Sequence, residues 1–233
     1  MSTLHKAQYS TLYTLRHTQE ARFSELMRAS HMESDLFKFH LRSLVRLGYI
    51  EKSLEGTYRL TPIGKELANN LDKSKRAIQK QPKLSVLIIV SRITDNKTEY
   101  LIQKRSRNPY FDYYGVLSGP IRWGDDPEDV AQHELHKQTG LQASFTVRGH
   151  YRQKDYAQAD NTLLEDKLFT VVEAVNVSGE ITNSWPGGTN YWMTVSQLQA
   201  EPKYFESSCN AIQMLEASES YISVKTVFSA KNY

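Results

Sequence analysis

Three basic side chains recur at helical spacing in the first third of the chain. Lys38, Arg42 and Arg46 stand four residues apart, so they lie on one face of any helix that spans them. A helix is narrow enough to enter the major groove of DNA, where lysine and arginine bind phosphates and guanine edges. The spacing therefore predicts contact with a polyanion.

The third of three expected helices carries these side chains. Apolar periodicity predicts helices over residues 5–18 and around 23–27, followed by one that Ser34 caps and Gly48 closes. Its buried side is expected to hold Leu36, Phe37, Leu41, Leu44, Val45 and Leu47. Its other side is expected to hold the DNA contacts, namely Ser34, Asp35, Lys38, Phe39, Arg42 and Arg46.

A two-stranded ribbon and a fourth helix are expected next. Residues 49–53 and 57–61 alternate around a turn at Gly56, and Pro62 begins a helix that ends near Leu71. The order resembles that of winged-helix repressors of the MarR and ArsR type, in the segments Arg22-Phe-Ser-Glu-Leu, His40-Leu-Arg-Ser-Leu-Val-Arg-Leu-Gly-Tyr-Ile and Tyr58-Arg-Leu-Thr-Pro-Ile-Gly. The resemblance implies a DNA-binding domain over residues 1–73, with Gly56 at the hairpin tip along the DNA backbone. A protein-binding winged helix is the alternative.

Charge is unevenly distributed along the chain. Residues 1–83 hold 15 lysines and arginines against 8 acidic residues, giving +7, whereas residues 84–233 hold 14 against 18, giving −4. A basic first third favours a nucleic-acid partner, although a solvated basic face would have the same composition. Residues 73–83 hold five positive and no negative charges, and Pro82 disfavours a continuous helix, so a basic linker is expected over residues 74–83.

Several function classes are disfavoured by composition. The apolar run over residues 84–90 is far shorter than the roughly 20 residues of a membrane-spanning helix, and no signal peptide is recognisable, so a cytoplasmic protein without a membrane partner is expected. The single cysteine, Cys209, cannot form an internal disulfide. A catalytic role for Cys209 is not expected, because no histidine motif accompanies it.

A second domain is expected over residues 84–233. The pattern predicts a hairpin of strands 84–93 and 100–103, and a helix that Asp126 caps and Gly140 ends. Further extended segments are expected over residues 145–151, 168–177 and 191–194, before a closing helix over residues 204–217.

The segment from Gly119 to Leu141 resembles the Nudix box. Five residues match its pattern: Gly119, Glu134, Leu135, Gly140 and Leu141. Four positions depart from it, because Asp125 replaces the first glutamate, His133 replaces arginine, and Lys137-Gln138 replace a glutamate pair. The resemblance, which extends over about residues 84–217, implies a Nudix-type α/β/α sandwich with a mixed sheet. With the first domain, the predicted fold class is α+β.

The departures affect the metal site that the resemblance implies. Nudix enzymes hold divalent cations with carboxylates at helix positions i, i+3 and i+4, where this chain has Glu134, Lys137 and Gln138. No cofactor is therefore expected and no catalytic residue is assigned. If the chain is a Mg²⁺-dependent hydrolase, Glu134 and Asp125 are the candidate metal ligands, and Glu134 the candidate catalytic residue. Asp126, Glu165 and Asp166 are further carboxylates that loops could supply.

The cations of this region could instead bind a ligand directly. The candidate ligand-binding residues are Arg105, Arg107, Gly119, Arg122, Glu134 and Lys137. The layout resembles Nudix-related bacterial regulators, although those generally place the winged helix second. It predicts a homodimeric transcription regulator that binds double-stranded DNA and senses a nucleotide or sugar-phosphate ligand. The alternatives are an active Nudix hydrolase with an accessory winged helix, cleaving a nucleoside diphosphate derivative, and a scaffold that binds neither.

Overall fold

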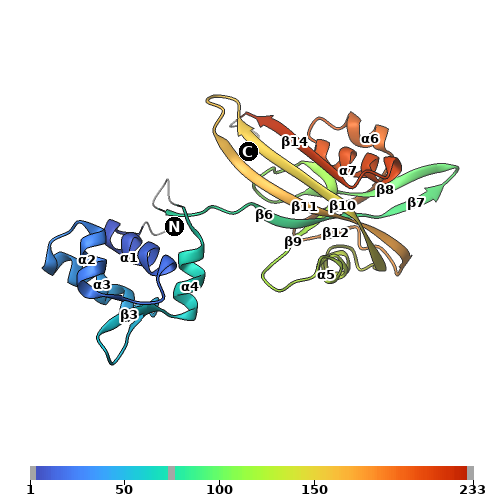
Figure 1. Cartoon of the computed structure of the whole chain (residues 1–233). Helices are drawn as coiled ribbons and strands as arrows, with labels where there is room; N and C mark the ends of the chain where they lie inside the picture. The colour runs from blue at the N-terminus through green and yellow to red at the C-terminus, as the bar shows by residue number, and fades with distance from the viewer. Residues whose placement is uncertain (1–3, 73–76, 230–233) are drawn as a thin grey trace. The chain divides into compact units, whose positions relative to one another are not determined.

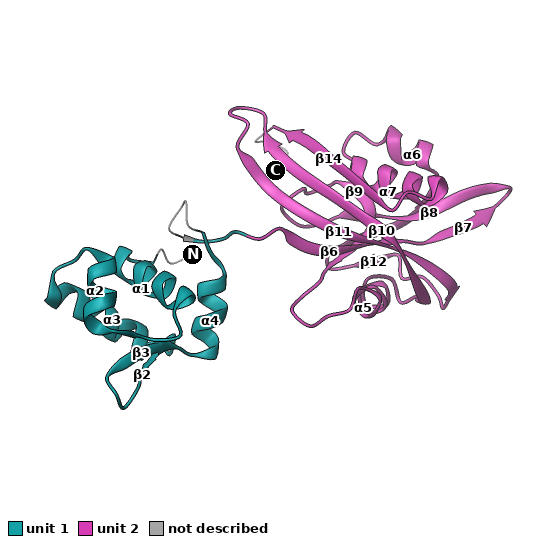
Figure 2. Ribbon diagram, in the orientation of Figure 1, with its two compact units in different colours: residues 1–80 teal, residues 81–233 magenta. Residues whose placement is uncertain are grey.

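The computed structural model describes residues 4–72 and 77–229 and divides the chain into two compact units. The first unit comprises residues 1–80 and the second residues 81–233 (Figure 2). Of the linker expected over residues 74–83, residues 74–76 lie outside the described part. Two parts of the remaining linker lie in strands. Strand β5 (Ala77–Ile78) pairs antiparallel with β4 (Leu71–Asp72), and Lys83 is the first residue of a strand of the second unit.

The first unit contains four helices and a small sheet within its described residues. Its remaining elements are α1 (Lys6–His17), β1 (Ala21–Arg22), α2 (Phe23–Ser30), α3 (Ser34–Arg46), β2 (Ile50–Lys52), β3 (Thr57–Leu60) and α4 (Pro62–Asn69). Strands β2 and β3 form the expected hairpin, and β1 adds a third strand on the far side of β3. The helices and the hairpin follow one another in the order expected from the sequence.

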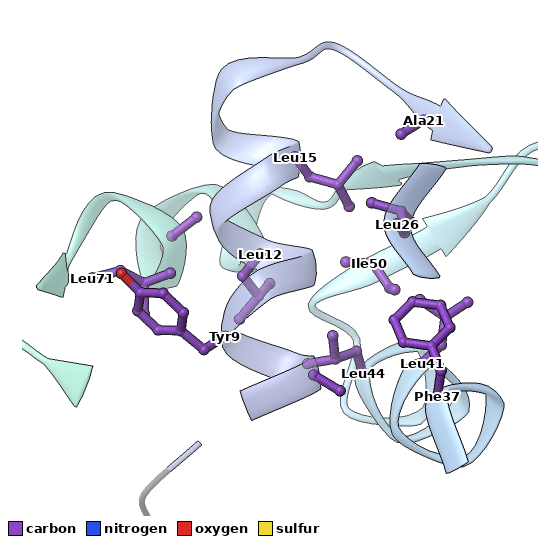
Figure 3. Packing of buried hydrophobic residues seen from close by; sticks show 12 residues of the cluster. Tyr9, Leu12, Leu15, Ala21, Leu26, Phe37, Leu41, Leu44, Ile50 and Leu71 are labelled. Carbon is purple, nitrogen blue, oxygen red and sulfur yellow. The ribbon is translucent and has the colours of Figure 1, made fainter. Parts of the chain in front are cut away.

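Local residues explain where these helices begin and end. His5 caps α1, because its Nδ1 accepts the N–H of Ala7, and Thr61 caps α4 through the N–H of Gly64. Gly48 follows α3 with a φ of +74°, a conformation that costs glycine little. The helices pack on one core, in which Leu12, Leu26, Phe37, Leu44 and Ile50 lie (Figure 3).

The buried side of α3 is narrower than the sequence suggested. Phe37, Leu41 and Leu44 are buried, at the i, i+4, i+7 spacing of one helix face. The expectation was wrong for three further residues, because Leu36, Val45 and Leu47 are 50%, 40% and 53% exposed. Ser34 is the first helical residue, and Glu33 takes the capping position that was expected for Ser34.

Within its described residues, the second unit is built on one nine-stranded mixed sheet. Its strands are β6 (Lys83–Ile89), β7 (Ser91–Thr94), β8 (Lys97–Arg105), β9 (Tyr114–Pro120), β10 (Gln142–Ala157), β11 (Leu163–Ser178), β12 (Ser184–Trp185), β13 (Gly188–Met193) and β14 (Tyr221–Phe228). The order is β12-β13-β8-β9-β6-β11-β10-β14, with β7 paired to β8. The helices are α5 (Pro127–Thr139), α6 (Val195–Ala200) and α7 (Glu206–Ala217).

Strand β6 explains why so long an apolar run occurs in the sequence. Val86 and Ile88 pack in the core that contains Leu135 of α5, whereas Leu87 and Ile89 pack in the core that contains Ile212 of α7. Both faces of the strand are therefore buried, which favours a continuous rather than an alternating apolar pattern. Helix α5 lies on one side of the sheet, and α6 and α7 lie on the other (Figure 1).

The strands differ from the expectation in several places. The segment 84–93 forms two strands, β6 and β7, and β7 makes the hairpin with β8. Strand β9 was not expected, and the helix expected to close the domain is followed by β14, which pairs in parallel with β10. Among the described residues, no helix has the length and apolar composition needed to cross a membrane.

Candidate functional site

Glu134 lines a hollow formed by the end of β9, α5 and the loop between them. Pro127 occupies the first turn of α5, and Gly140 ends the helix with a φ of +77°. Asp126 takes the capping position, but its side chain makes no capping hydrogen bond. The Glu134 hollow is lined by Pro120, Arg122, Gly124, Asp125, Asp126, Asp129, Val130, His133, Glu134 and Lys137.

Gly119 lets α5 approach β9 closely. A Cβ added to Gly119 would overlap Cγ of Glu134, so only glycine leaves room for this side chain. Glu134 is consequently 9% exposed although it carries a charge. Gly119 thus positions Glu134 by packing.

Two neighbours on the same helix hold the Glu134 carboxylate. Lys137 Nζ lies 3.0 Å from Oε1, and Gln138 Nε2 donates to Oε2 at 2.8 Å. The Gln138 amide also donates to the carbonyl of Ser118 at 3.0 Å. The ammonium of Lys137 and the amide of Gln138 therefore interact with the carboxylate oxygens that would otherwise bind a metal ion.

A magnesium ion does not fit this donor set. Mg²⁺ needs several oxygen ligands in near-octahedral geometry, and here an ammonium nitrogen and an amide nitrogen occupy the positions beside Glu134. Within the described residues, no group of three or more His, Cys, Asp or Glu side chains is placed to hold a metal ion. The Glu134 carboxylate is thus held by an ion pair with Lys137 and a hydrogen bond from Gln138.

Asp125 and His133 line the same hollow without pairing with each other. The Asp125 carboxylate accepts the backbone N–H of Arg122 at 2.9 Å, which closes the loop before α5. In the described part of the chain no hydrogen bond or ion pair joins Asp125 to His133. Asp125 and His133 stand at the glutamate and arginine positions of the Nudix box, but the contact of Asp125 stays within its own loop.

A second cavity of about 220 Å³, the Arg105 cavity, shares no lining residue with the Glu134 hollow. Strands β6, β8, β9, β10 and β11, the segment between β8 and β9, and the start of α7 contribute its walls. They supply Lys83, Ser85, Leu87, Gln103, Arg105, Arg107, Pro109, Tyr110, Gly115, Val116, Ser118, Gln153, Glu165, Lys167, Phe169, Phe205, Ser207 and Ser208. The structure therefore separates Arg105 and Arg107 from the candidates Arg122, Glu134 and Lys137.

A network of ion pairs includes three lining residues of the Arg105 cavity, Lys83, Glu165 and Lys167. Lys167 Nζ lies 2.7 Å from Asp155 and 2.9 Å from Glu165, and Lys83 also pairs with Glu165. Tyr110 donates its hydroxyl to Asp155 at 2.8 Å. Burial by itself would raise the pKa of Glu165, but hydrogen bonds from Lys83 and Lys167 bring that pKa below its ordinary value.

Two arginines of this cavity have no carboxylate partner among the described residues. Arg105 donates through Nη2 to the carbonyl of Pro109 at 3.1 Å, and its Nε is buried without a hydrogen-bond partner. Burial and the charge of Arg107 lower the pKa of Arg105. The Arg107 guanidinium lies 5.8 Å from the ring centroid of Trp185, and Lys137 Nζ lies 5.6 Å from it, so one cation of each site lies near the same indole ring.

In the first unit, a hollow of about 640 Å³ lies between α3 and the β2–β3 hairpin. It is lined by Phe23, Ser34, Lys38, Leu41, Arg42, Val45, Arg46, Lys52, Gly56 and Tyr58. Five of the seven predicted DNA contacts are among these residues, while Asp35 and Phe39 are not. The described residues offer no carboxylate within ion-pair distance of Lys38, Arg42 or Arg46.

These features can be compared with known proteins. A family model described as "NUDIX domain" matches residues 83–211. The chain belongs to the NUDIX family. No curated protein sequence matches it.

The chain is also similar to solved structures of NUDIX proteins. The mutator MutT protein of Bacillus halodurans is 13% identical with a TM-score of 0.50, and the match covers 65% of this chain and 93% of that one. The NUDIX domain of Shewanella oneidensis NrtR, complexed with ADP ribose, is 16% identical with a TM-score of 0.48, covering 67% and 96%. The MutT NUDIX hydrolase of Burkholderia pseudomallei is 20% identical with a TM-score of 0.46, covering 57% and 98%.

Sequence reasoning missed most residues of the Arg105 cavity. Gln153 and Asp155 lie beyond the strand expected over residues 145–151, and the register pairs them with Lys167 and Glu165 of β11. Residues 152–155 and 165–167 are runs of consecutive polar residues, so no apolar alternation indicated that the two strands extend this far. Cys209 is half-buried and burial raises the pKa of its thiol, so the thiolate needed by a nucleophile is disfavoured.

Proposed function

We propose that this NUDIX-family chain is a DNA-binding transcription regulator whose NUDIX domain binds a nucleotide-type or phosphorylated metabolite without hydrolysing it. The observation that carries the proposal is the Glu134 carboxylate, which Lys137 and Gln138 hold where a NUDIX hydrolase needs a metal ion. The domain keeps the fold and its cavities while the metal-binding chemistry is replaced. In this sense the NUDIX site is catalytically degenerate.

The first unit is proposed to be a winged helix that binds double-stranded DNA. Helix α3 presents Lys38, Arg42 and Arg46 beside the β2–β3 hairpin, so a phosphate backbone could contact helix and hairpin together. A homodimer would place two such helices on paired half-sites. Ligand binding regulates DNA affinity if the ligand has different affinities for two dimer geometries.

The second candidate function is a Mg²⁺-dependent NUDIX pyrophosphohydrolase. The observation in its favour is that Asp125, Asp126 and Asp129 line the same hollow as Glu134. Rearrangement of the loop before α5 would be required to bring these carboxylates to a shared ion, because Asp125 accepts a backbone hydrogen bond within that loop.

A hydrolysis screen with thermal shift on the same samples separates the two functions. Purified full-length chain is incubated with nucleoside diphosphate derivatives and Mg²⁺, beside the Glu134→Gln variant. We expect no turnover above that of the variant, because Glu134 is already paired. Mg²⁺-dependent turnover that Glu134→Gln abolishes would establish the hydrolase and refute the regulator with a degenerate site.

A further inference from the structure

We propose that strand β14 is the dimer interface of this chain, and that it pairs antiparallel with β14 of a second copy about a twofold axis. This inference rests on the homodimer of the proposed function and names the surface that forms it. The strand lines neither the Glu134 hollow nor the Arg105 cavity. It also lies beyond residues 83–211, so the match to the NUDIX family does not account for it.

Strand β14 forms one edge of the nine-stranded sheet, beside β10 (Figure 1). In a parallel pair, only alternate residues of a strand bond to the neighbouring strand. At the two ends of this pair, His150 N–H donates to the carbonyl of Ser220 and Gln158 N–H donates to the carbonyl of Phe228. The even-numbered residues of β14 therefore bond to β10. The N–H and C=O groups of the odd-numbered residues face away from the sheet, at Tyr221, Ser223, Lys225 and Val227.

This edge lacks the features that usually protect an edge strand from pairing. Such features are short length, prolines, charges and bulges. Strand β14 has eight residues and no proline, Lys225 is its single charge, and its register with β10 has no shift. Two further edge strands of the sheet within the described residues, β12 and β7, have only two and four residues. The β14 edge is thus long and open enough to accept another strand.

The sequence of β14 complements itself in one register. With the axis at Val224, this residue lies opposite itself, Tyr221 lies opposite Val227, and the odd-numbered residues exchange about eight backbone hydrogen bonds. An aromatic residue opposite a β-branched residue stabilises a strand pair. With the axis at Lys225, two ammonium groups would face each other, and with the axis at Ser223, the partner of Val227 would lie outside the strand.

The two faces of the joined sheet would also match. A twofold axis perpendicular to the sheet brings equivalent faces of both copies to the same side. On the α7 side, Ile222 and Val224 pack against the core, and the pairs Val224–Val224 and Ile222–Thr226 would continue this apolar row across the axis. On the other side, Tyr221 and Val227 are 56% and 59% exposed, and each would contact the other across the interface. This match favours a second copy over an unrelated peptide.

A cysteine cross-link tests the interface and its register. Val224→Cys is made in the full-length chain together with Cys209→Ser, so that the new thiol is the single cysteine. Opposed Cα atoms in a non-hydrogen-bonded antiparallel pair are about 4.5 Å apart, which a disulfide spans. We expect a disulfide-linked dimer on mild oxidation of Val224→Cys and none for Lys225→Cys in the same background. Cross-linking through Lys225→Cys would overturn the register, and absence of any cross-link would overturn the interface.

Ser223→Pro tests the same edge without a thiol. The N–H of residue 223 faces away from β10, so proline removes a bond to the second copy and none within the sheet. By sedimentation equilibrium, we expect its dimer dissociation constant to rise at least tenfold, while Ser223→Ala stays unchanged and circular dichroism is alike in both. A monomeric unaltered chain, or undiminished dimerisation of a folded Ser223→Pro, would overturn the interface.

DNA binding by the same proteins separates failure of the interface from failure of the proposed function. A dimer that depends on β14 but selects no DNA sequence would refute the regulator and support the interface. Sequence-specific DNA binding by a chain that neither cross-links nor responds to Ser223→Pro would support the regulator and overturn the interface.

Discussion

The amide of Gln138 occupies the position at which the Nudix box has a metal-binding glutamate. Its Nε2 lies 2.8 Å from a Glu134 oxygen and 3.0 Å from the Ser118 carbonyl, so a carboxylate at this position would face two acceptors. Such an arrangement is stable only with a proton or a cation between the oxygens. The amide resolves the conflict without a metal, and Lys137 supplies the positive charge.

Restoring both glutamates should therefore create a metal site. The double variant Lys137→Glu/Gln138→Glu is expected to lose roughly 1–3 kcal/mol of stability without Mg²⁺, because buried acceptors then face each other. Mg²⁺ should restore stability in proportion to its binding, which thermal unfolding across a Mg²⁺ titration measures. Lys137→Gln, which adds no carboxylate, is the control. Equal Mg²⁺ stabilisation of the unaltered chain would contradict the account.

Glu165 makes the stability of the second unit depend on pH. Its pKa lies below the ordinary value of 4.5, so the folded chain binds this proton more weakly than the unfolded chain does. The contribution of Glu165 is complete above pH 4.5 and is lost as the pH falls through its lower folded pKa. Glu165→Gln should flatten this part of the stability curve, measured by denaturant unfolding from pH 6 to pH 3. The exposed Glu180→Gln should leave the curve as steep as in the unaltered chain.

At the scale of elements, the sequence predicted the helices better than the strands. Pro62, Gly48 and Gly140 mark helix ends by local backbone preferences, and each lies at a helix end in the structure. Strand β9 was missed because Gly115 and Gly119 weaken the β pattern. Their role is tertiary, since side chains at these positions would overlap Phe205 and Glu134.

The candidate sites divide in the same way. The sequence could predict that Lys38, Arg42 and Arg46 lie together, because one helix holds them. Gln153 and Lys167 of the Arg105 cavity come together only through the pairing of β10 with β11. Strand β14 pairs with β10 across more than sixty residues, and no local pattern encodes that partner. Contacts that depend on long-range pairing were the ones that sequence reasoning could not place.

The junction of α4 with the hairpin offers a test at this scale. A Cβ on Gly64 would overlap the backbone carbonyl of Tyr49, which cannot move without disturbing its hydrogen bond from Thr61 N–H. Gly64→Ala should therefore destabilise the first unit by about 1–3 kcal/mol, although alanine favours helices. Hydrogen exchange of the α1 and α3 amides reports this loss. The neighbouring, exposed Lys65→Ala should change it little, and equal effects of the two variants would exclude the packing explanation.

At the scale of the whole molecule, the proposed function joins a basic unit that would bind DNA to a NUDIX domain that would bind a ligand without cleaving it. The two units have net charges of opposite sign, since residues 1–80 hold 14 lysines and arginines against 8 acidic residues and residues 81–233 hold 15 against 18. DNA affinity should therefore depend on the cations of α3 and should fall with salt. Each phosphate contact that is lost reduces the slope of log affinity against log salt by about 0.9.

The most direct test of the central claim is selection of duplex DNA by the full-length chain from a random library, followed by fluorescence anisotropy at several salt concentrations. We expect an enriched sequence that the chain binds, with binding lost in Lys38→Gln/Arg42→Gln and retained in Lys65→Gln, which removes a charge from α4. The double variant should also have a shallower salt dependence. Absence of any enriched sequence, or equal binding by the double variant, would contradict the regulator.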